Sequence, residues 1–367
     1  MYSSNVTIQK PTLLLNHQRA SENIRKMADK AQQSRVRFRP HFKTHQSAQI
    51  GEWFRQFEVE AITVSSVEMA QYFAQHGWQD ITIAFPANIL EIDLIKQLTD
   101  RVNLGLLVES TETVHFLAKN LTASVNVWLK VDVGYGRTGV PWSDYDTLVG
   151  LAEQVKETSQ LSLQGLLTHS GHTYRARSKL EIETVYRDTV SKMKAAQENL
   201  AMAGVEPVEL SIGDTPSCSV VADLSDVDEI RPGNFVFYDL MQLQIGACRE
   251  QDIAVAVACP VVAKHPKRHQ LVIYGGAVHL SKEFIVEDNV QVFGYVARRK
   301  DDGWGPRLAN AHVSGLSQEH GIITSDGDTI NQVEVGDLLV ILPVHSCLTV
   351  NLLREYLTFD GEKYSCM

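Results

Sequence analysis

Short β-rich runs alternate with longer stretches of helical spacing from about residue 35 to residue 240, and this alternation constrains the fold more than any other feature of the sequence. The expected strands cover residues 36–40, 61–65, 81–85, 102–108, 125–131, 161–169, 207–213 and 234–239. Apolar spacing predicts helices between them, including one over 66–77 and one over 183–204. This pattern is typical of an α/β protein built as a (β/α)8 TIM-type barrel. The first strand is not followed by G-x-G-x-x-G, which argues against a dinucleotide-binding fold.

The pattern changes after about residue 245. Strand-like runs over 253–265, 269–276, 290–299 and 337–347 are separated by turn sequences, and no long helix is expected there. This part of the chain predicts a second, all-β domain following the barrel. We expect the barrel to span residues 20–243, and the β domain to comprise residues 1–19 and 244–367.

Composition narrows the class of protein. The 44 acidic and 34 basic residues give a formal net charge of −10, which argues against nucleic acid or an anionic membrane as the main partner. No apolar run approaches the length of a membrane-spanning helix, and residues 1–20 lack the features of a signal peptide. Five cysteines, scattered and odd in number, indicate a reducing compartment. We therefore expect a soluble cytoplasmic protein of a size typical of enzymes.

Polar residues gather at the C-terminal ends of five expected barrel strands, where barrels of this kind place their catalytic groups. In chain order they are Lys43, Arg137, the group His169, His172 and Tyr174, the segment 211–217, and Tyr238 with Asp239. Packing alone does not require so many polar residues at these positions. The sequence therefore predicts an active site at this end of the barrel.

The segment SIGDTPS, residues 211–217, has the composition of a phosphate-binding loop. Gly213 permits a tight turn, and Thr215 and Ser217 supply hydroxyls ahead of an expected helix start. Barrels commonly bind phosphate at the loops after the seventh and eighth strands. The alternative is an ordinary Thr-Pro turn in which Ser217 caps a helix.

Lys43 lies in RPHFKTHQS, residues 39–47, between His41 and His45 and just past the first expected strand. A lysine in such a place is usually a solvated charge. Combined with a phosphate site across the barrel mouth and with Arg137, an amine that forms a Schiff base points instead to pyridoxal phosphate.

The segment PVHSC near the C-terminus carries His345 and Cys347 with one residue between them. On a strand both side chains would share one face, and imidazole with thiolate is a ligand pair that suits zinc. Two protein ligands leave coordination positions open, which is typical of a catalytic metal. The alternative is a buried cysteine beside a histidine with structural hydrogen bonds.

These motifs resemble the fold-type III pyridoxal-phosphate enzymes, which share the alanine racemase barrel. More narrowly, the chain resembles the family of D-threonine aldolase and eukaryotic-type D-serine dehydratase. The similar segments are PHFKTHQ, VDVGYGRTGV, GHTY, SIGDTPS, EIRPGNFVFYD, QEHG and PVHSC. They occur in the same order and cover nearly the whole chain, which makes the resemblance specific.

The resemblance implies a set of site residues. Lys43 would hold pyridoxal 5'-phosphate through its amine, with Arg137 near the phenolic oxygen of the ring and Tyr174 near the reacting centre. Gly213 and Thr215 would bind the phosphate, with His169 and Tyr238 as further cofactor contacts. His345 and Cys347 would ligate zinc, or alternatively manganese. His172 is a candidate proton carrier, and the roles of His41 and His45 stay open.

The sequence departs from the family pattern in two places. The family usually has glycine where Asp214 stands, and a carboxylate beside a phosphate is unfavourable unless it points away. The segment 274–283 also lacks an expected Asp-x-Gly pattern in a region that often faces the substrate. The substrate is therefore open within the family.

The implied activity is that of a lyase acting on D-3-hydroxy amino acids. Cys347 favours elimination of water, giving a keto acid and ammonia, because aldolases of this family tend to carry a carboxylate at the second metal position. Retro-aldol cleavage to glycine and an aldehyde is the alternative. An amino-acid racemase and a non-catalytic cofactor-binding protein are weaker alternatives. The resemblance also implies a homodimer with sites near the interface.

Overall fold

The structure, a computed structural model, describes residues 7–206 and 208–367. The chain divides into two compact units. The barrel unit comprises residues 25–43 and 51–233, and the β unit comprises residues 7–24, 44–50 and 234–367. The first helix, α1 (His17–Ser34), begins in the β unit and ends in the barrel unit.

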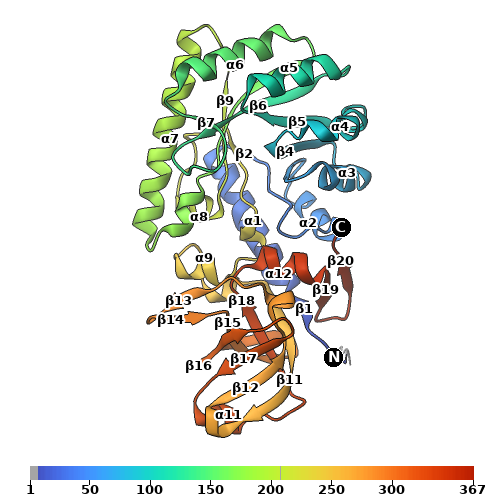
Figure 1. Cartoon of the computed structure of the whole chain (residues 1–367), viewed down its shortest axis with the longest axis vertical. Coiled ribbons are helices and arrows are strands. Elements are labelled where there is room, and N and C mark those ends of the chain that lie inside the picture. The colour runs from blue at the N-terminus through green and yellow to red at the C-terminus, as the bar shows by residue number, and fades with distance from the viewer. Residues whose placement is uncertain (1–6, 207) are drawn as a thin grey trace. The chain divides into compact units, whose positions relative to one another are not determined.

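The barrel unit contains eight strands in the order β2-β10-β9-β8-β6-β5-β4-β3, all paired in parallel. Among them, β4, β5 and β6 are labelled in Figure 1. They are β2 (Arg37–Phe38), β3 (Ala61–Val64), β4 (Asp80–Pro86), β5 (Asn103–Val108), β6 (Val125–Asp132), β8 (Leu161–Leu167), β9 (Glu209–Ile212) and β10 (Glu229–Ile230). A bridge between His41 and Thr63 joins the two end strands of this order. The expected (β/α)8 barrel is therefore confirmed.

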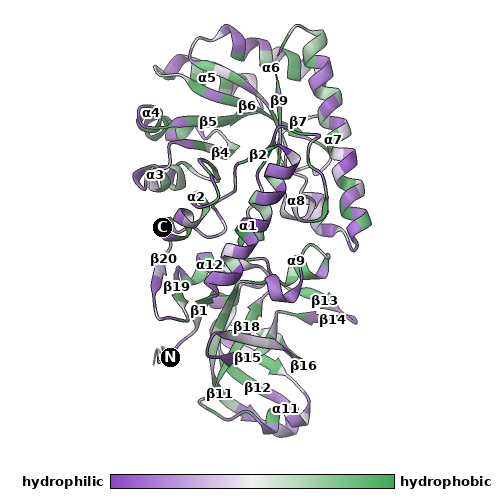
Figure 2. Ribbon diagram, turned by 180° about the vertical axis from the view of Figure 1, so that it is seen from behind, coloured by the Kyte–Doolittle hydropathy of each residue, from purple (hydrophilic) through white to green (hydrophobic). Residues whose placement is uncertain are grey.

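Helices follow the strands along the barrel unit, and the first of them, α2 (Ala48–Arg55), begins in the β unit. The bounds of the others are α3 (Val67–Gln75), α4 (Ile92–Thr99), α5 (Thr111–Asn120), α6 (Tyr145–Glu157), α7 (Lys179–Met202) and α8 (Thr215–Val220). The helices predicted over 66–77 and 183–204 are confirmed as α3 and α7. Gly77 and Gly204 adopt positive φ just past the ends of these helices, a conformation that glycine adopts without strain. In Figure 2 both hydrophobic and hydrophilic residues are seen along α7, and its buried residues include Ile182, Tyr186 and Leu200.

The prediction for the eighth strand was wrong. It was expected at 234–239, but β10 is Glu229–Ile230, and Asn234–Val236 forms a short 3₁₀ turn. Pro232 has no N–H to donate to a strand ladder. The N–H groups of Phe237 and Tyr238 both bond back to the carbonyl of Asn234, which curls the segment. The seventh strand is shorter than the expected 207–213, of which Pro207 lies outside the described residues.

The β unit is built on a nine-stranded sheet in the order β12-β17-β16-β15-β18-β11-β1-β19-β20. Its strands are β1 (Thr12–Leu15), β11 (Val255–His265), β12 (Gln270–Tyr274), β15 (Gly294–Lys300), β16 (Gly303–Leu316), β17 (His320–Thr324), β18 (Leu338–Pro343), β19 (Glu355–Thr358) and β20 (Lys363–Ser365). All neighbours are antiparallel except β1 and β19. The expected all-β second domain is confirmed, with a two-stranded hairpin, β13 (Ile285–Glu287) and β14 (Val290–Val292), beside it.

Short helices complete the β unit: α9 (Leu240–Gln244), α10 (Ala277–Leu280), α11 (Gly327–Asn331) and α12 (Ser346–Leu353). The strand expected over 290–299 is divided at Phe293 into β14 and β15. Within the described part of the chain, no helix combines the length and the apolar character needed to cross a membrane.

Candidate active site

Lys43 lies in a turn that follows β2 and is anchored by the residue before it. Phe42 is fully buried, and its ring centroid lies 4.9 to 5.0 Å from those of Phe54, Phe73 and Trp78. The Phe42 N–H also donates to the Thr63 carbonyl at 2.9 Å. Lys43 itself is exposed. The aromatic cluster therefore fixes the backbone of the turn while the lysine amine stays accessible.

The two histidines that flank Lys43 accept hydrogen bonds from the backbone two residues further on. The ring Nδ1 of His41 accepts from the Lys43 N–H at 3.4 Å, and Nδ1 of His45 accepts from the Ser47 N–H at 3.2 Å. Burial lowers the pKa of His45 to about 3, so this ring is neutral. Both histidines thus help to hold the backbone on either side of Lys43.

Arg137 lies in the glycine-rich turn after β6. The Asp132 carboxylate accepts hydrogen bonds from the N–H groups of Gly134 at 2.9 Å and Gly136 at 3.1 Å, and both glycines have positive φ. The Arg137 guanidinium carbon lies 5.2 Å from the centroid of the Tyr135 ring, a cation–π distance. Tyr135, which sequence analysis did not single out, therefore positions the arginine.

His169 is held as a neutral ring. Its Nδ1 hydrogen-bonds to the Gly213 carbonyl, and because a carbonyl only accepts, Nδ1 carries the proton and Nε2 the lone pair. Burial, together with the charge of Lys43, lowers the pKa of His169 well below its usual value. The ring lies 6.3 Å from that of Tyr174, centroid to centroid.

His172 lies with Tyr174 in a 3₁₀ turn, Gly171–Arg175, after β8. Its ring centroid is 6.4 Å from that of Tyr135. Its Nδ1 is buried and has no hydrogen-bond partner within residues 7–206 and 208–367. Burial and the charge of Lys192 lower the pKa of this ring. His172 is therefore a neutral imidazole able to accept a proton.

The loop between β9 and α8 carries buried polar atoms without partners. Thr215 Oγ1 and Ser217 Oγ are both of this kind among the described residues, which is rare unless a ligand or water completes the site. The helix cap is not Ser217: Asp214 caps α8, with Oδ1 accepting from the Ser217 N–H at 2.7 Å. Gly213 packs tightly, since a Cβ there would lie 2.9 Å from the Arg231 Cβ. These orphaned hydroxyls fit a phosphate.

The far end of α8 is held by Lys30 of α1. Its amine donates to three backbone carbonyls, those of Cys218 at 2.9 Å, Ser219 at 2.7 Å and Val221 at 3.0 Å. Burial lowers the pKa of Lys30, consistent with an amine enclosed by these carbonyls. Both ends of the short helix are therefore capped by side chains, and the loop before it is fixed.

A second lysine, Lys130 of β6, is buried inside the barrel unit. Its amine donates to the Val131 carbonyl at 3.1 Å. Burial, with the nearby charges of Arg231 and Arg137, lowers its pKa to about 7. Sequence analysis missed it, although a lysine inside the apolar run VNVWLKV was a visible signal.

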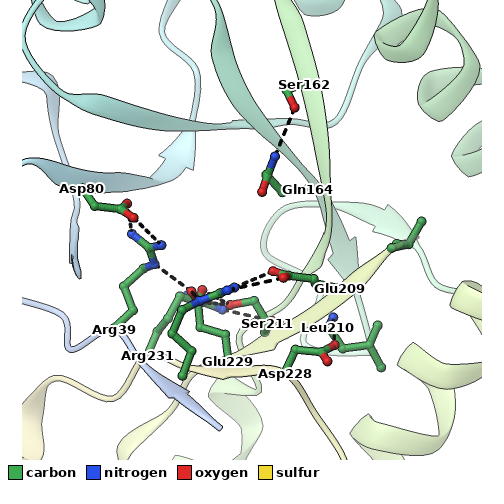
Figure 3. Close-up of polar contacts among 12 residues, drawn as sticks. Arg39, Asp80, Ser162, Gln164, Glu209, Leu210, Ser211, Asp228, Glu229 and Arg231 are labelled. Carbon is green, nitrogen blue, oxygen red and sulfur yellow. Dashed lines mark hydrogen bonds and ion pairs between the residues drawn. The ribbon is translucent and has the colours of Figure 1, made fainter. Parts of the chain in front are cut away.

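A charged network lies at the starts of the barrel strands (Figure 3). Arg39 donates to Glu229 at 2.7 Å and to Asp80 at 2.5 Å, and Arg37 donates to Glu229 at 2.7 Å and to Glu209. Although burial opposes its ionisation, the charges of Arg39 and Arg37 hold the pKa of Glu229 below its usual value. Both arginines are paired with carboxylates in this way, so the network is structural.

The H-x-C motif lies in the β unit, at a helix start rather than on a strand as predicted. The strand β18 ends at Pro343, His345 precedes α12, and Cys347 lies in its first turn. The chain turns here because the Ser346 N–H and hydroxyl bond to the Asp239 carboxylate at 3.0 and 3.2 Å. The two ligand candidates nevertheless lie close enough for their side chains to interact.

His345 and Cys347 form an imidazolium–thiolate pair, because the hydrogen bond and charge of Cys347 raise the pKa of His345 to about 9 although burial opposes this, and a bound metal would have to displace the imidazolium proton. Although burial opposes both charges, the hydrogen bond and charge of His345 hold the pKa of the Cys347 thiol below its usual value. Asn234 Nδ2 lies 3.6 Å and Thr44 Oγ1 3.4 Å from Cys347 Sγ. The His345 Nδ1 is buried without a partner in the described part of the chain. These donors fit a metal, although the described residues contain no cluster of three or more His, Cys, Asp or Glu ligands.

The predicted residues divide between the two units. The barrel unit holds Lys43, Arg137, His169, His172, Tyr174, Gly213 and Thr215, and the β unit holds Tyr238, His345 and Cys347. Within the barrel unit, the charges of Lys43, Arg137 and Lys130 all act on His169. The structure therefore brings the ends of β2, β6, β8 and β9 together around one histidine.

Comparison with known proteins decides the family. The model of the alanine racemase N-terminal domain matches residues 15–240, and a serine dehydratase domain model matches residues 254–359. The chain belongs to the alanine racemase N-terminal domain family. Enzymes of this family use pyridoxal phosphate, as the resemblance of the cofactor-lysine segment implied.

The curated relatives include both dehydratases and aldolases. The D-threo-3-hydroxyaspartate dehydratase of Delftia sp. (strain HT23) is 27% identical over 95% of this chain and 93% of its own length, and its structure matches with a TM-score of 0.91. The D-serine dehydratase of Dictyostelium discoideum is 29% identical over 96% of this chain and 93% of its length. The D-threonine aldolase of Arthrobacter sp. is 26% identical over 63% of this chain and 62% of its own length. A cysteine-to-alanine variant of a D-threo-3-hydroxyaspartate dehydratase, solved in a metal-free form, matches with a TM-score of 0.91 at 25% identity. Dehydratases and aldolases are both lyases, and this chain is a lyase of that group.

Proposed function

We propose that the protein is a pyridoxal-phosphate- and zinc-dependent dehydratase of D-3-hydroxy amino acids, releasing water to give a keto acid and ammonia. The observation that carries the proposal is the interacting pair of His345 and Cys347, a nitrogen and a sulfur ligand with lowered thiol pKa. In the family resemblance a cysteine at this second position favours dehydration. The full-length similarity to two dehydratases supports the same choice.

Lys43, Arg137, His169, Tyr174, Gly213, Thr215 and Tyr238 are the residues that would hold pyridoxal phosphate. When bound, the cofactor supplies an electron sink for the bond broken at the substrate's Cα. Lys43 is the amine that takes the Cα proton, because its backbone is fixed while its side chain is accessible. His169 presents a neutral Nε2, and His172, also neutral, is the second group that could carry a proton.

His345 and Cys347 would hold the zinc ion, with manganese as the alternative metal. A metal with two protein ligands keeps positions for water or substrate and supplies a Lewis acid for the leaving hydroxyl. We predict that Cys347→Ala lowers both the bound zinc and the dehydratase rate, the latter by roughly 10²- to 10³-fold. Metal analysis and steady-state kinetics check this, with Cys248→Ala as the matched control. Unchanged zinc and rate in Cys347→Ala would remove the metal proposal.

The first experiment identifies the reaction. Cofactor-loaded protein is incubated with D-serine, D-threonine and D-threo-3-hydroxyaspartate, with and without a chelator, and the products are analysed. Keto acid and ammonia, lost on chelation and restored by zinc, are expected. Glycine with an aldehyde would identify an aldolase, and exchange of the Cα proton without either product would identify a racemase.

The proposal extends to organisation. The barrel domain would span residues 20–243 and the β domain residues 1–19 and 244–367, in a cytoplasmic homodimer. Apolar side chains exposed on the barrel unit, Phe85 at 57% and Leu90 at 89%, support an interface between copies. Light scattering checks this prediction, and a fully active monomer contradicts it.

A further inference from the structure

Asp214 lies between Gly213 and Thr215, the two residues to which we assign the phosphate, and its side chain is buried. Its Oδ1 accepts hydrogen bonds from the Ser217 N–H at 2.7 Å and from the Thr173 hydroxyl at 3.0 Å. Its Oδ2 is buried and has no partner among the residues that the structure describes. One oxygen of the carboxyl group is therefore fixed by the protein, and the other is left for something else.

The surroundings of Asp214 do not neutralise it. Arg231 exerts a favourable charge, but its hydrogen bonds go to the Ser211 hydroxyl at 2.7 Å and the Thr168 carbonyl at 2.5 Å. The other titratable groups packed around this loop are Cys218 of α8, Tyr186 of α7, His169 after β8 and Lys30 of α1. Burial raises the pKa of Cys218 and of Tyr186, which keeps both uncharged. Lys30 donates to the carbonyls at the opposite end of α8.

A phosphate bound at this loop would be a second anion beside Asp214, and its charge affects whether the Asp214 carboxyl group is protonated. Burial raises the pKa of Asp214 to about 6, despite the hydrogen bonds from Ser217 and Thr173. A phosphate on the neighbouring Thr215 hydroxyl would bring like charge into contact with the carboxylate. Two such acids in a buried site do not both stay fully ionised, so one proton is retained between them.

We propose that Asp214 binds the cofactor's phosphate as a neutral acid, with the Oδ2–H group donating a hydrogen bond to a phosphate oxygen. The proton is taken from solvent when the cofactor binds, and the phosphate and carboxyl share it. Asp214, which stands where the family usually has glycine, would then contact the phosphate directly and make the cofactor affinity depend on pH. This inference rests on the proposed function, because it requires pyridoxal phosphate at this loop.

The test measures proton uptake when pyridoxal phosphate binds to the cofactor-free protein. Calorimetry in two buffers of different ionisation enthalpy gives the number of protons taken up, and absorbance titration gives Kd. Wild type and Asp214→Asn are compared, since the asparagine amide still donates to phosphate and still caps α8 but does not titrate. At about pH 8 we expect wild type to take up close to one proton more per cofactor. Its Kd should rise about tenfold per pH unit relative to the variant.

Each other outcome has a definite meaning. Equal proton uptake and parallel Kd curves for the two proteins overturn the inference while leaving the proposed function intact. Failure of wild type to bind the cofactor at any pH overturns the proposed function itself. Pyridoxal, which lacks the phosphate, is the control ligand, and a difference between the proteins that persists with it also overturns the inference. If Asp214→Asn does not fold, Asp214→Gly, the residue usual in the family, replaces it in the same comparison.

Discussion

The two ends of the barrel unit differ in whether their buried polar groups have hydrogen-bond partners. Where the strands begin, Arg39, Asp80 and Glu229 are joined by hydrogen bonds of 2.5 to 2.7 Å (Figure 3). Where the strands end, Thr215 Oγ1 and Asp214 Oδ2 are buried with no partner in the described chain. The same barrel therefore contains a satisfied polar network and an unsatisfied one.

This difference distinguishes polar groups that stabilise the fold from polar groups that bind a ligand. Folding alone favours pairing every buried polar group, because a group left without a partner is costly. A cluster that stays unpaired lowers the stability of the empty protein and is retained where a ligand completes it. Substitutions at the two ends should therefore change the free energy of unfolding in opposite directions.

The largest effect is expected at the satisfied end. Glu229→Gln removes the buried carboxylate that Arg39 and Arg37 share and leaves them only their outer partners, Asp80 and Glu209, so the free energy of unfolding should fall by about 3 kcal/mol. Denaturant unfolding of the cofactor-free protein measures this loss. Asp226→Asn is the matched control, because its pair with Lys194 is exposed and should contribute about 1 kcal/mol or less. A loss no larger than that of the control would show that the network does not stabilise the barrel.

An effect of opposite sign is expected for Asp214→Asn in the cofactor-free protein. Because the folded pKa of about 6 exceeds the ordinary value of 3.8, the folded state binds more protons between these values and loses stability as pH rises through this window. Removing the carboxylate should therefore stabilise the protein by up to about 3 kcal/mol at neutral pH, with no gain near pH 4. Unfolding curves at a series of pH values test this, and a variant destabilised at pH 7 would contradict it.

The fold was largely predictable because strand and helix periodicities are local. Seven of the eight barrel strands were placed near their true positions, as was α7 with its stop at Gly204. The eighth strand was misplaced because NFVFYD is a short continuous run of apolar and aromatic residues, a composition that favours a strand. In the structure the run forms a turn and not a strand, because Pro232 lacks an N–H and the Asn234 carbonyl accepts from the N–H groups of Phe237 and Tyr238. The H-x-C motif was misplaced for the same reason, since Asp239 turns the chain at Ser346 from a distant part of the sequence.

The candidate site was predictable only where one residue type carries the chemistry. Lys43 and the H-x-C pair could be singled out from the sequence, because an amine that forms a Schiff base and an imidazole–thiol pair each suggest a chemical role by residue type alone. The roles of Tyr135, Lys130 and Lys30 depend on which distant groups they meet, such as the carbonyls that Lys30 caps. Burial and partners of this kind follow from the tertiary structure, not from spacing.

The smallest expected effect on stability is that of Thr215→Val, which tests directly whether an unpaired polar group at the end of the strands serves ligand binding. Thr215→Val replaces a buried hydroxyl that has no partner within the described residues by a methyl group of similar size. Because no hydrogen bond inside the protein is lost, the cofactor-free protein should keep its stability or gain about 1 kcal/mol. Affinity for pyridoxal phosphate should fall about tenfold, because one hydrogen bond to a charged group is lost. Thermal unfolding and absorbance titration of the same sample measure the two quantities. A variant that loses stability but keeps its affinity would place the Thr215 hydroxyl among the structural groups and would end the distinction between the two ends.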